Sequence, residues 1–128
     1  MKKCIAIILL LILLIPTLCF GIDTVNEKSQ ATLTVSFKDE NGTAVIPTKF
    51  IYWSKDVVTN TTLKVATTIN PVAASYAITI PSNENRIIDT RKSHEDKKVS
   101  VEWYSGVTLI GTADYTYRVN NLSYIPIP

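Results

Sequence analysis

The chain has 128 residues but only two cysteines, four glycines and one histidine. Both cysteines, Cys4 and Cys19, lie within the first 21 residues, so no disulfide and no thiolate metal site can form in the rest of the chain. A domain of about a hundred residues without cross-links depends on its hydrophobic core, and at that size one core is sufficient. None of the four glycines belongs to a glycine-rich motif of the kind that binds phosphate.

The chain also lacks a strong excess of charge. It has 13 basic and 11 acidic residues, and Lys2 and Lys3 account for the difference. The part after residue 21 is therefore formally neutral. Proteins that bind nucleic acids or anionic lipids in general need a clustered positive surface, so the composition argues against both partners.

One long hydrophobic run is present, and it stands at the N-terminus. Lys2 and Lys3 precede an almost unbroken apolar run over residues 4–20, which Pro16 interrupts and Gly21 ends. This layout is typical of a secretory signal cleaved after Gly21. An uncleaved membrane-anchor helix is the alternative, because a run of about 17 apolar residues only just spans a bilayer. Acylation of Cys19 is disfavoured because no small residue precedes it. The sequence predicts an exported protein that is periplasmic, extracellular or membrane-tethered.

Past residue 30 the pattern changes to the period of a β-strand. Leu33, Val35 and Phe37 alternate with Thr32 and other polar residues, which predicts a half-buried strand. Residues 22–30 are polar without periodicity and predict a tether, and residues 123–128 predict a tail. Residues 82–98 predict a polar loop with a single helical turn at its start. Further strands are expected at 44–46, 49–54, 63–69, 75–81, 99–104 and 109–119.

About six or seven strands, spaced near ten residues apart and without any helical period, predict an all-β fold. A two-sheet sandwich and a small barrel both satisfy this pattern. The chain length and the long connection before the penultimate strand favour the sandwich. We therefore expect an antiparallel sandwich of the immunoglobulin-like or fibronectin III-like kind over residues 31–122, preceded by the signal or anchor helix.

An ordered series of segments supports this expectation. They are 31–37 (ATLTVSF), 39–42 (DENG) with Val45 and Pro47, 78–80 (ITI), 85–89 (NRIID), 98–101 (KVSV) and 115–122 (YTYRVNNL). Together they resemble the small immunoglobulin-like domains of tailed-phage virion proteins. The resemblance implies a non-enzymatic structural part of a particle, such as a decoration, fibre-base or neck-associated domain.

Residues that carry chemistry do not form a recognisable motif. His94 could join Glu95, Asp96 and Asp89 in a metal site, but basic residues flank the group on both sides, and a solvated loop is the better interpretation. The Asp39-Glu40 and Glu95-Asp96 pairs are also typical of solvated turns. No serine lies in a Gly-x-Ser-x-Gly motif. We expect no enzyme activity, no metal site and no cofactor.

Aromatic residues provide one candidate interaction face. Tyr104, Tyr115 and Tyr117 fall on the last two expected strands, where pairing could place them together. Trp53 would join them if Phe50 and Tyr52 take the core positions of their strand. Such a face suits sugar stacking or protein docking. The alternative is ordinary packing against cross-strand neighbours.

Two functions are therefore open for this chain. One is a structural or interaction module, virion-associated or displayed on a surface, with proteins as partners. The other is a secreted or envelope-attached adhesin or carbohydrate-binding module, with glycans as ligands.

Overall fold

A computed structural model describes residues 24–124, and these fold into seven strands without a helix. The predicted signal or anchor segment and the last four residues lie outside the described part of the chain. No helix that could span a membrane occurs between residues 24 and 124. The strands are β1 (Thr24–Asn26), β2 (Ala31–Ser36), β3 (Lys49–Asp56), β4 (Thr62–Ile69), β5 (Ser75–Ile80), β6 (His94–Ser105) and β7 (Thr108–Asn120).

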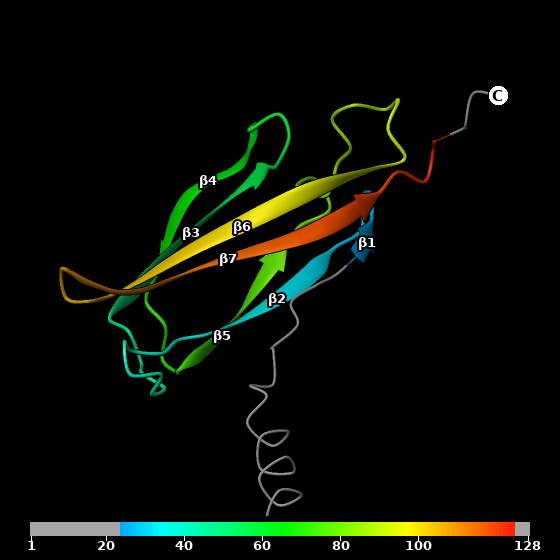
Figure 1. Cartoon of the computed structure of the whole chain (residues 1–128). Helices are drawn as coiled ribbons and strands as arrows, with labels where there is room; N and C mark the ends of the chain where they lie inside the picture. Colours follow the sequence, from blue (N-terminus) through cyan, green and yellow to red (C-terminus); the bar gives the residue numbers. More distant parts are fainter. Residues whose placement is uncertain (1–23, 125–128) are drawn as a thin grey trace, which may run out of the picture.

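These strands form two layers (Figure 1). One sheet has five strands in the order β1-β7-β6-β3-β4, and the other pairs β2 with β5. Inward side chains of both sheets share one hydrophobic core, so the fold is a β-sandwich, as the strand pattern predicts. All neighbouring strands are antiparallel except β1 and β7, which run parallel. The expectation of a wholly antiparallel sandwich is therefore wrong at this edge.

The two-stranded sheet follows directly from alternation in the sequence. Leu33 and Val35 on β2 are buried, whereas Thr32 and Thr34 are exposed. Their partners on β5, Ile78 and Tyr76, face the same way. Apolar residues at every second position can all enter the core from one face of a pleated strand.

In β3, Phe50 and Tyr52 take the core positions, and Ile51 and Trp53 do not. Phe50 is completely buried, and its ring centroid lies 5.1 Å from that of Phe37 on the opposite layer. Tyr52 packs partly buried against the core. Since neighbouring side chains of a strand point to opposite faces, Trp53 lies on the outer face.

Trp103 on β6 occupies the core between the layers. Its ring contacts that of Phe37 edge-on at a centroid distance of 5.7 Å. The indole N–H donates a hydrogen bond of 2.9 Å to the backbone carbonyl of Lys38. A buried tryptophan needs such an acceptor for its one polar group. The ring therefore ties β6 to the chain that leaves β2.

Residues 44–46 do not form the expected strand, because Pro47 follows them directly and only Ala44 makes an isolated bridge, to Lys38. Two further segments differ from the sequence prediction. Residues 24–26, predicted as part of a tether, form β1, which pairs with residues 118–120 of β7. A three-residue strand is too short to show a period, and its partner lies at the other end of the chain. The second difference is β6, which begins at His94 and not at Val99.

Buried charged residues explain why the sequence pattern does not indicate the early start of β6. Glu95 and Lys97 face inward, with Glu95 5 % exposed and Lys97 fully buried. Burial of a charge is ordinarily costly, so a sequence segment rich in charged residues predicts a solvated loop. The actual loop, residues 81–93, consists of turns and bends, so the predicted helical turn is absent there. Ile87 of this loop packs against the core.

Candidate functional site

The structure divides the four aromatic residues of the predicted interaction face between the two sides of the large sheet. Trp53 lies opposite Ser100, and Tyr104 pairs with Lys49 and, after a bulge, with Leu109, all on the outer side. Tyr115 pairs with the buried Val99, and Tyr117 with the buried Lys97, both on the inner side. The four residues cannot form one face, because the register assigns them to opposite sides.

The two inner tyrosines belong to the core. Tyr117 is 3 % exposed, and its hydroxyl donates a hydrogen bond of 2.8 Å to Oδ1 of the buried Asn85. Burial raises the pKa of Tyr117. Tyr115 packs partly buried against the same core. These contacts make both residues part of the scaffold, which is the packing alternative noted for them above.

Tyr104 takes part in a polar cluster on the outer side. The ammonium of Lys49 lies 5.0 Å from the centroid of its ring, and its hydroxyl donates to Glu102 Oε2 at 2.7 Å. The hydrogen bond to Glu102 raises the pKa of Tyr104. Trp53, in contrast, stands partly exposed beside Lys55 on the same face. Only Trp53 and Tyr104 thus remain from the predicted site on an accessible surface.

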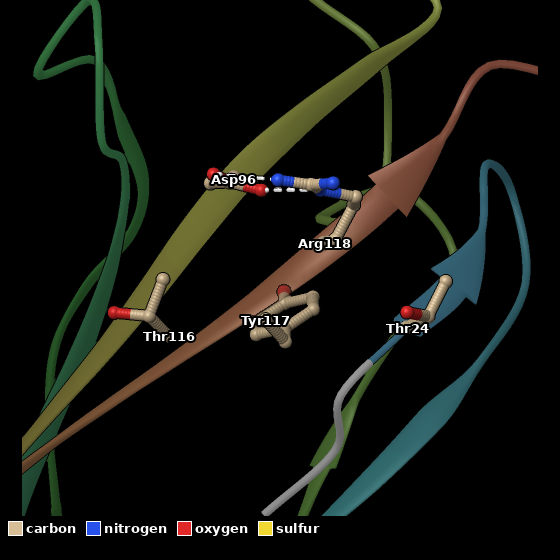
Figure 2. A pocket seen from close by; sticks show the side chains of 5 residues that line it. All are labelled: Thr24, Asp96, Thr116, Tyr117 and Arg118. Carbon is tan, nitrogen blue, oxygen red and sulfur yellow. Dashed lines mark hydrogen bonds and ion pairs between the residues drawn. The ribbon is translucent and has the colours of Figure 1, made fainter.

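An ion pair and a hydrogen bond to a carboxylate lie elsewhere on this outer face. Arg118 donates to Asp96 at 3.0 Å, and Asp114 accepts from Ser100 at 2.6 Å. Figure 2 shows the Asp96–Arg118 pair beside a shallow hollow of about 330 Å³ where β1 begins. The hollow is also lined by Thr24, Thr116 and Tyr117. Its two charged groups already satisfy each other, so it offers no free charge to a ligand.

A second region lies at one end of the sandwich, where three loops meet. They are residues 37–48 between β2 and β3, 70–74 between β4 and β5, and 106–107 between β6 and β7 (Figure 1). Backbone N–H of Phe37 donates to Ala74 O at 2.8 Å, which joins the first two loops. Gly106 N–H donates to Thr48 Oγ1 at 2.8 Å, which joins the first and third. We refer to these three loops as the loop end.

Large apolar side chains are exposed at the loop end. Val72 and Val107 are each 93 % exposed, and Ile46 is 62 % exposed. A hollow of about 300 Å³ lies between the first of these loops and the start of β7. Its lining combines acidic, polar and apolar side chains: Asp39, Glu40, Asn41, Thr108, Leu109 and Ile110. Apolar groups beside a polar rim are the composition of a protein-binding surface.

The first of these loops is held in a defined shape. Oδ1 of Asp39 accepts hydrogen bonds of 2.9 Å from the backbone N–H groups of Asn41 and Thr43. Gly42 adopts φ of 81°, a conformation that favours glycine. A preorganised loop loses little conformational entropy when a partner binds. The Asp39-Glu40 pair indicates this turn in the sequence, but Val72 and Val107 lie far from it along the chain, so no local pattern brings the three together.

The residues considered for catalysis or metal binding do not converge. His94 Nδ1 lies 3.0 Å from Ser93 Oγ, and Asp89 pairs with Arg91. Glu95 points inward, whereas Asp96 points outward. Across residues 24–124, no three histidine, cysteine or acidic side chains are arranged to hold a metal ion. These groups therefore do not form a joint site.

Comparison of the chain with protein-family models, with curated proteins and with solved structures finds no match.

Proposed function

We propose that this chain is an exported, non-catalytic module of the immunoglobulin-like kind that binds another protein through its loop end. The observation that carries the proposal is the exposure of Ile46, Val72 and Val107 on three loops, of which the first is hydrogen-bonded to each of the other two. Exposed apolar side chains on loops that are joined to one another are typical of a protein-binding surface. The sandwich holds the three loops in fixed relative positions.

The strand order supports the immunoglobulin-like assignment. In variable-type immunoglobulin domains, strands G, F and C are neighbours and C′ extends their sheet, while B and E belong to the other sheet. Strands β7, β6, β3 and β4 have the first arrangement, and β2 and β5 have the second. On this assignment the loops β2–β3 and β6–β7 correspond to B–C and F–G, which bind antigen in variable domains. One departure is that the core tryptophan stands on β6 and not on β3.

The place of action is inferred from the N-terminal segment. Charged residues followed by an apolar run and Gly21 are the features that support export. Export agrees with display at a cell surface. The resemblance to phage virion domains supports a virion-associated variant of the same role. If the chain is expressed in bacteria, we expect it outside the cytoplasm with Ile22 as its N-terminal residue. Cytoplasmic full-length protein in mass spectrometry would contradict export.

The loop-end proposal can be tested by site-specific photo-crosslinking. A photoreactive amino acid at Val107 or at Val72 should attach one and the same protein in cells or particles that carry this chain. Thr34 is the matched control, because it is exposed on the outer face of the small sheet and does not belong to a loop. Equal crosslinking from Thr34 and Val107 would contradict the proposal. Val107→Asp should abolish the adduct formed from position 72 without unfolding the domain.

Carbohydrate binding is the second candidate, and Trp53 is the observation that favours it. Its indole stands on a polar sheet face, where sugars could stack on the ring. A glycan array with the wild-type chain and Trp53→Ala separates the two functions. Binding that is lost in Trp53→Ala but retained in Val107→Asp would support the carbohydrate-binding function over the loop end.

A further inference from the structure

Three charged side chains meet inside the sandwich, at the end away from the loop end. Lys97 of β6 is directly opposite Asp56 of β3 and two residues after Glu95. Its Nζ lies 3.1 Å from Asp56 Oδ2 and 2.5 Å from Glu95 Oε2. Lys97 is fully buried, Asp56 is 1 % exposed and Glu95 is 5 % exposed. An amine and two carboxylates are thus in contact without access to bulk water.

The loop 81–93 helps to enclose this group. Backbone N–H groups of Ile88 and Asp89 donate to the two oxygens of Glu95 at 2.9 and 2.6 Å. These donors and Lys97 lower the pKa of Glu95, although burial by itself raises it. Glu95 therefore remains a carboxylate with one oxygen against the amine. It is placed to accept a proton from Lys97.

The hydrogen bonds to Asp56 differ from those to Glu95, and they suggest that the carboxyl group of Asp56 can react with the amine. Its Oδ2 faces Lys97, whereas its Oδ1 accepts hydrogen bonds from Thr59 N–H at 2.7 Å and from Thr59 Oγ1 at 2.8 Å. If the amine attacked Cγ of Asp56, negative charge would develop on Oδ1. Two donors aimed at the oxygen that gains charge are the arrangement of an oxyanion hole.

A contribution to folding stability is a weak explanation for this buried group of three charges. Buried ion pairs often contribute no more stability than apolar residues of the same volume, because desolvation offsets their attraction. Here one ammonium faces two carboxylates. The four components of an acyl transfer are nevertheless present: a nucleophile, a base, a carbonyl carbon and oxyanion donors.

From this geometry we propose that Lys97 and Asp56 form an intramolecular isopeptide bond. A proton first passes from the ammonium of Lys97 to Oδ2 of Asp56, leaving a neutral amine and a carboxylic acid. Nζ then attacks Cγ, Glu95 removes the second proton from Nζ, and Thr59 stabilises the charge on Oδ1. Glu95 returns this proton to the departing Oδ2 hydroxyl, which leaves as water. The C–O bond is replaced by a C–N bond, and Glu95 is regenerated without any other reactant.

The bond would join the central strands β3 and β6 across 41 residues of sequence. It would thereby provide a covalent cross-link to a domain in which residues 22–128 contain no cysteine. This inference is independent of what the loop end binds. It concerns a self-catalysed modification, so it should occur in any expression host once the chain has folded.

Mass spectrometry of the purified, denatured wild-type chain tests the proposal directly. After proteolysis we expect one branched peptide that contains both Asp56 and Lys97. Its mass should be lower than the sum of the two linear peptides by one water molecule. Recovery of the two linear peptides with unmodified masses would overturn the proposal. This measurement requires no variant and so cannot be confused by a failure to fold.

Variants then test the assigned roles. Glu95→Gln should prevent the cross-link, and Thr59→Val should slow its formation in a refolding time course. Asp56→Asn should lose ammonia in place of water if it reacts, which identifies the attacked carbon. Lys98→Arg, which changes the exposed neighbour that pairs with Asp114, is the control and should cross-link fully. A complete cross-link in Glu95→Gln would overturn the role of Glu95 as base.

Discussion

The indole ring of Trp103 fills the space that a side chain at position 111 would occupy. Trp103 and Gly111 are paired residues of β6 and β7. A Cβ atom built on Gly111 would lie 2.2 Å from Cζ2 of the ring. The glycine is therefore required by this close approach and not by a special backbone angle. The ring gains its place in the core because its cross-strand partner has no side chain.

Gly111→Ala should consequently destabilise the domain. The added methyl group must displace the indole ring or the backbone of β7, at a cost of about 1–3 kcal/mol. Denaturant titration measures the loss. Thr112→Ala, an exposed neighbour on the same strand, is the control and should change the free energy of unfolding by less than about 0.5 kcal/mol. Equal effects of the two substitutions would contradict the steric explanation.

Replacement of the two tryptophans should have unequal effects. Trp103→Ala removes a buried ring that contacts Phe37 and should cost about 3–5 kcal/mol. Trp53→Ala removes a partly exposed ring from the outer face of β3, so its cost should be clearly smaller. Equilibrium unfolding of both variants in guanidinium chloride decides the comparison. A larger loss for Trp53→Ala would mean that β3 has the opposite register.

Tyr117→Phe should be destabilising although it removes a single oxygen atom. It leaves Oδ1 of the buried Asn85 without the Tyr117 hydroxyl as donor, and an unsatisfied buried acceptor costs about 1–3 kcal/mol. Tyr104→Phe is the matched control, because the Tyr104 hydroxyl donates to Glu102 on the outer face, where water can replace it. Thermal or chemical unfolding should therefore separate the two variants clearly. If both substitutions were neutral, the buried hydrogen bond would contribute no stability.

Glu84 should give the domain a characteristic pH dependence. Burial raises the pKa of Glu84 above its ordinary value of 4.5, against the hydrogen bond from Ser54 and the charge of Lys64, which lower it. The folded state therefore keeps this proton to higher pH than the unfolded state. The contribution of Glu84 to stability falls as the pH rises from 4.5 through the folded-state pKa.

A comparison with Glu84→Gln isolates this contribution. The variant cannot ionise at position 84, so its stability relative to wild type should increase as the pH rises through that window. Unfolding free energies of both proteins at several pH values between 4 and 7 provide the measurement, in a range where carboxylates titrate. A difference between the two that does not change with pH would contradict a raised pKa of Glu84.

Several parts of the fold could be predicted from local pattern alone. Leu33 and Val35 on β2, and Val99, Val101 and Trp103 on β6, occupy core positions as their alternation indicates. The signal in each case is an apolar residue at every second position, and it needs no knowledge of the partner strand. For β3, the sequence did not show which face enters the core, because apolar residues stand at successive positions. Only packing against Phe37 and Trp103 selects Phe50 for the core.

The candidate sites could not be predicted in the same way. The loop end joins residues 46, 72 and 107, which belong to three separate connections, and each appears in the sequence as one apolar residue near a turn. The buried group joins residues 56, 95 and 97, whose charges predict a solvated surface. Their burial becomes favourable only because each charge meets a partner from another strand or loop.

The sequence by itself thus determined the all-β class, the positions of most strands and the face that each regular strand buries, because these depend on the two-residue period of a single strand. The tertiary structure decided which strands are neighbours, that Thr24–Asn26 belongs to the sheet, and which distant residues share the loop end or the buried charged group. These depend on contacts between segments far apart in the chain. Such contacts arise from the simultaneous packing of all strands against one core, and no local pattern contains that information.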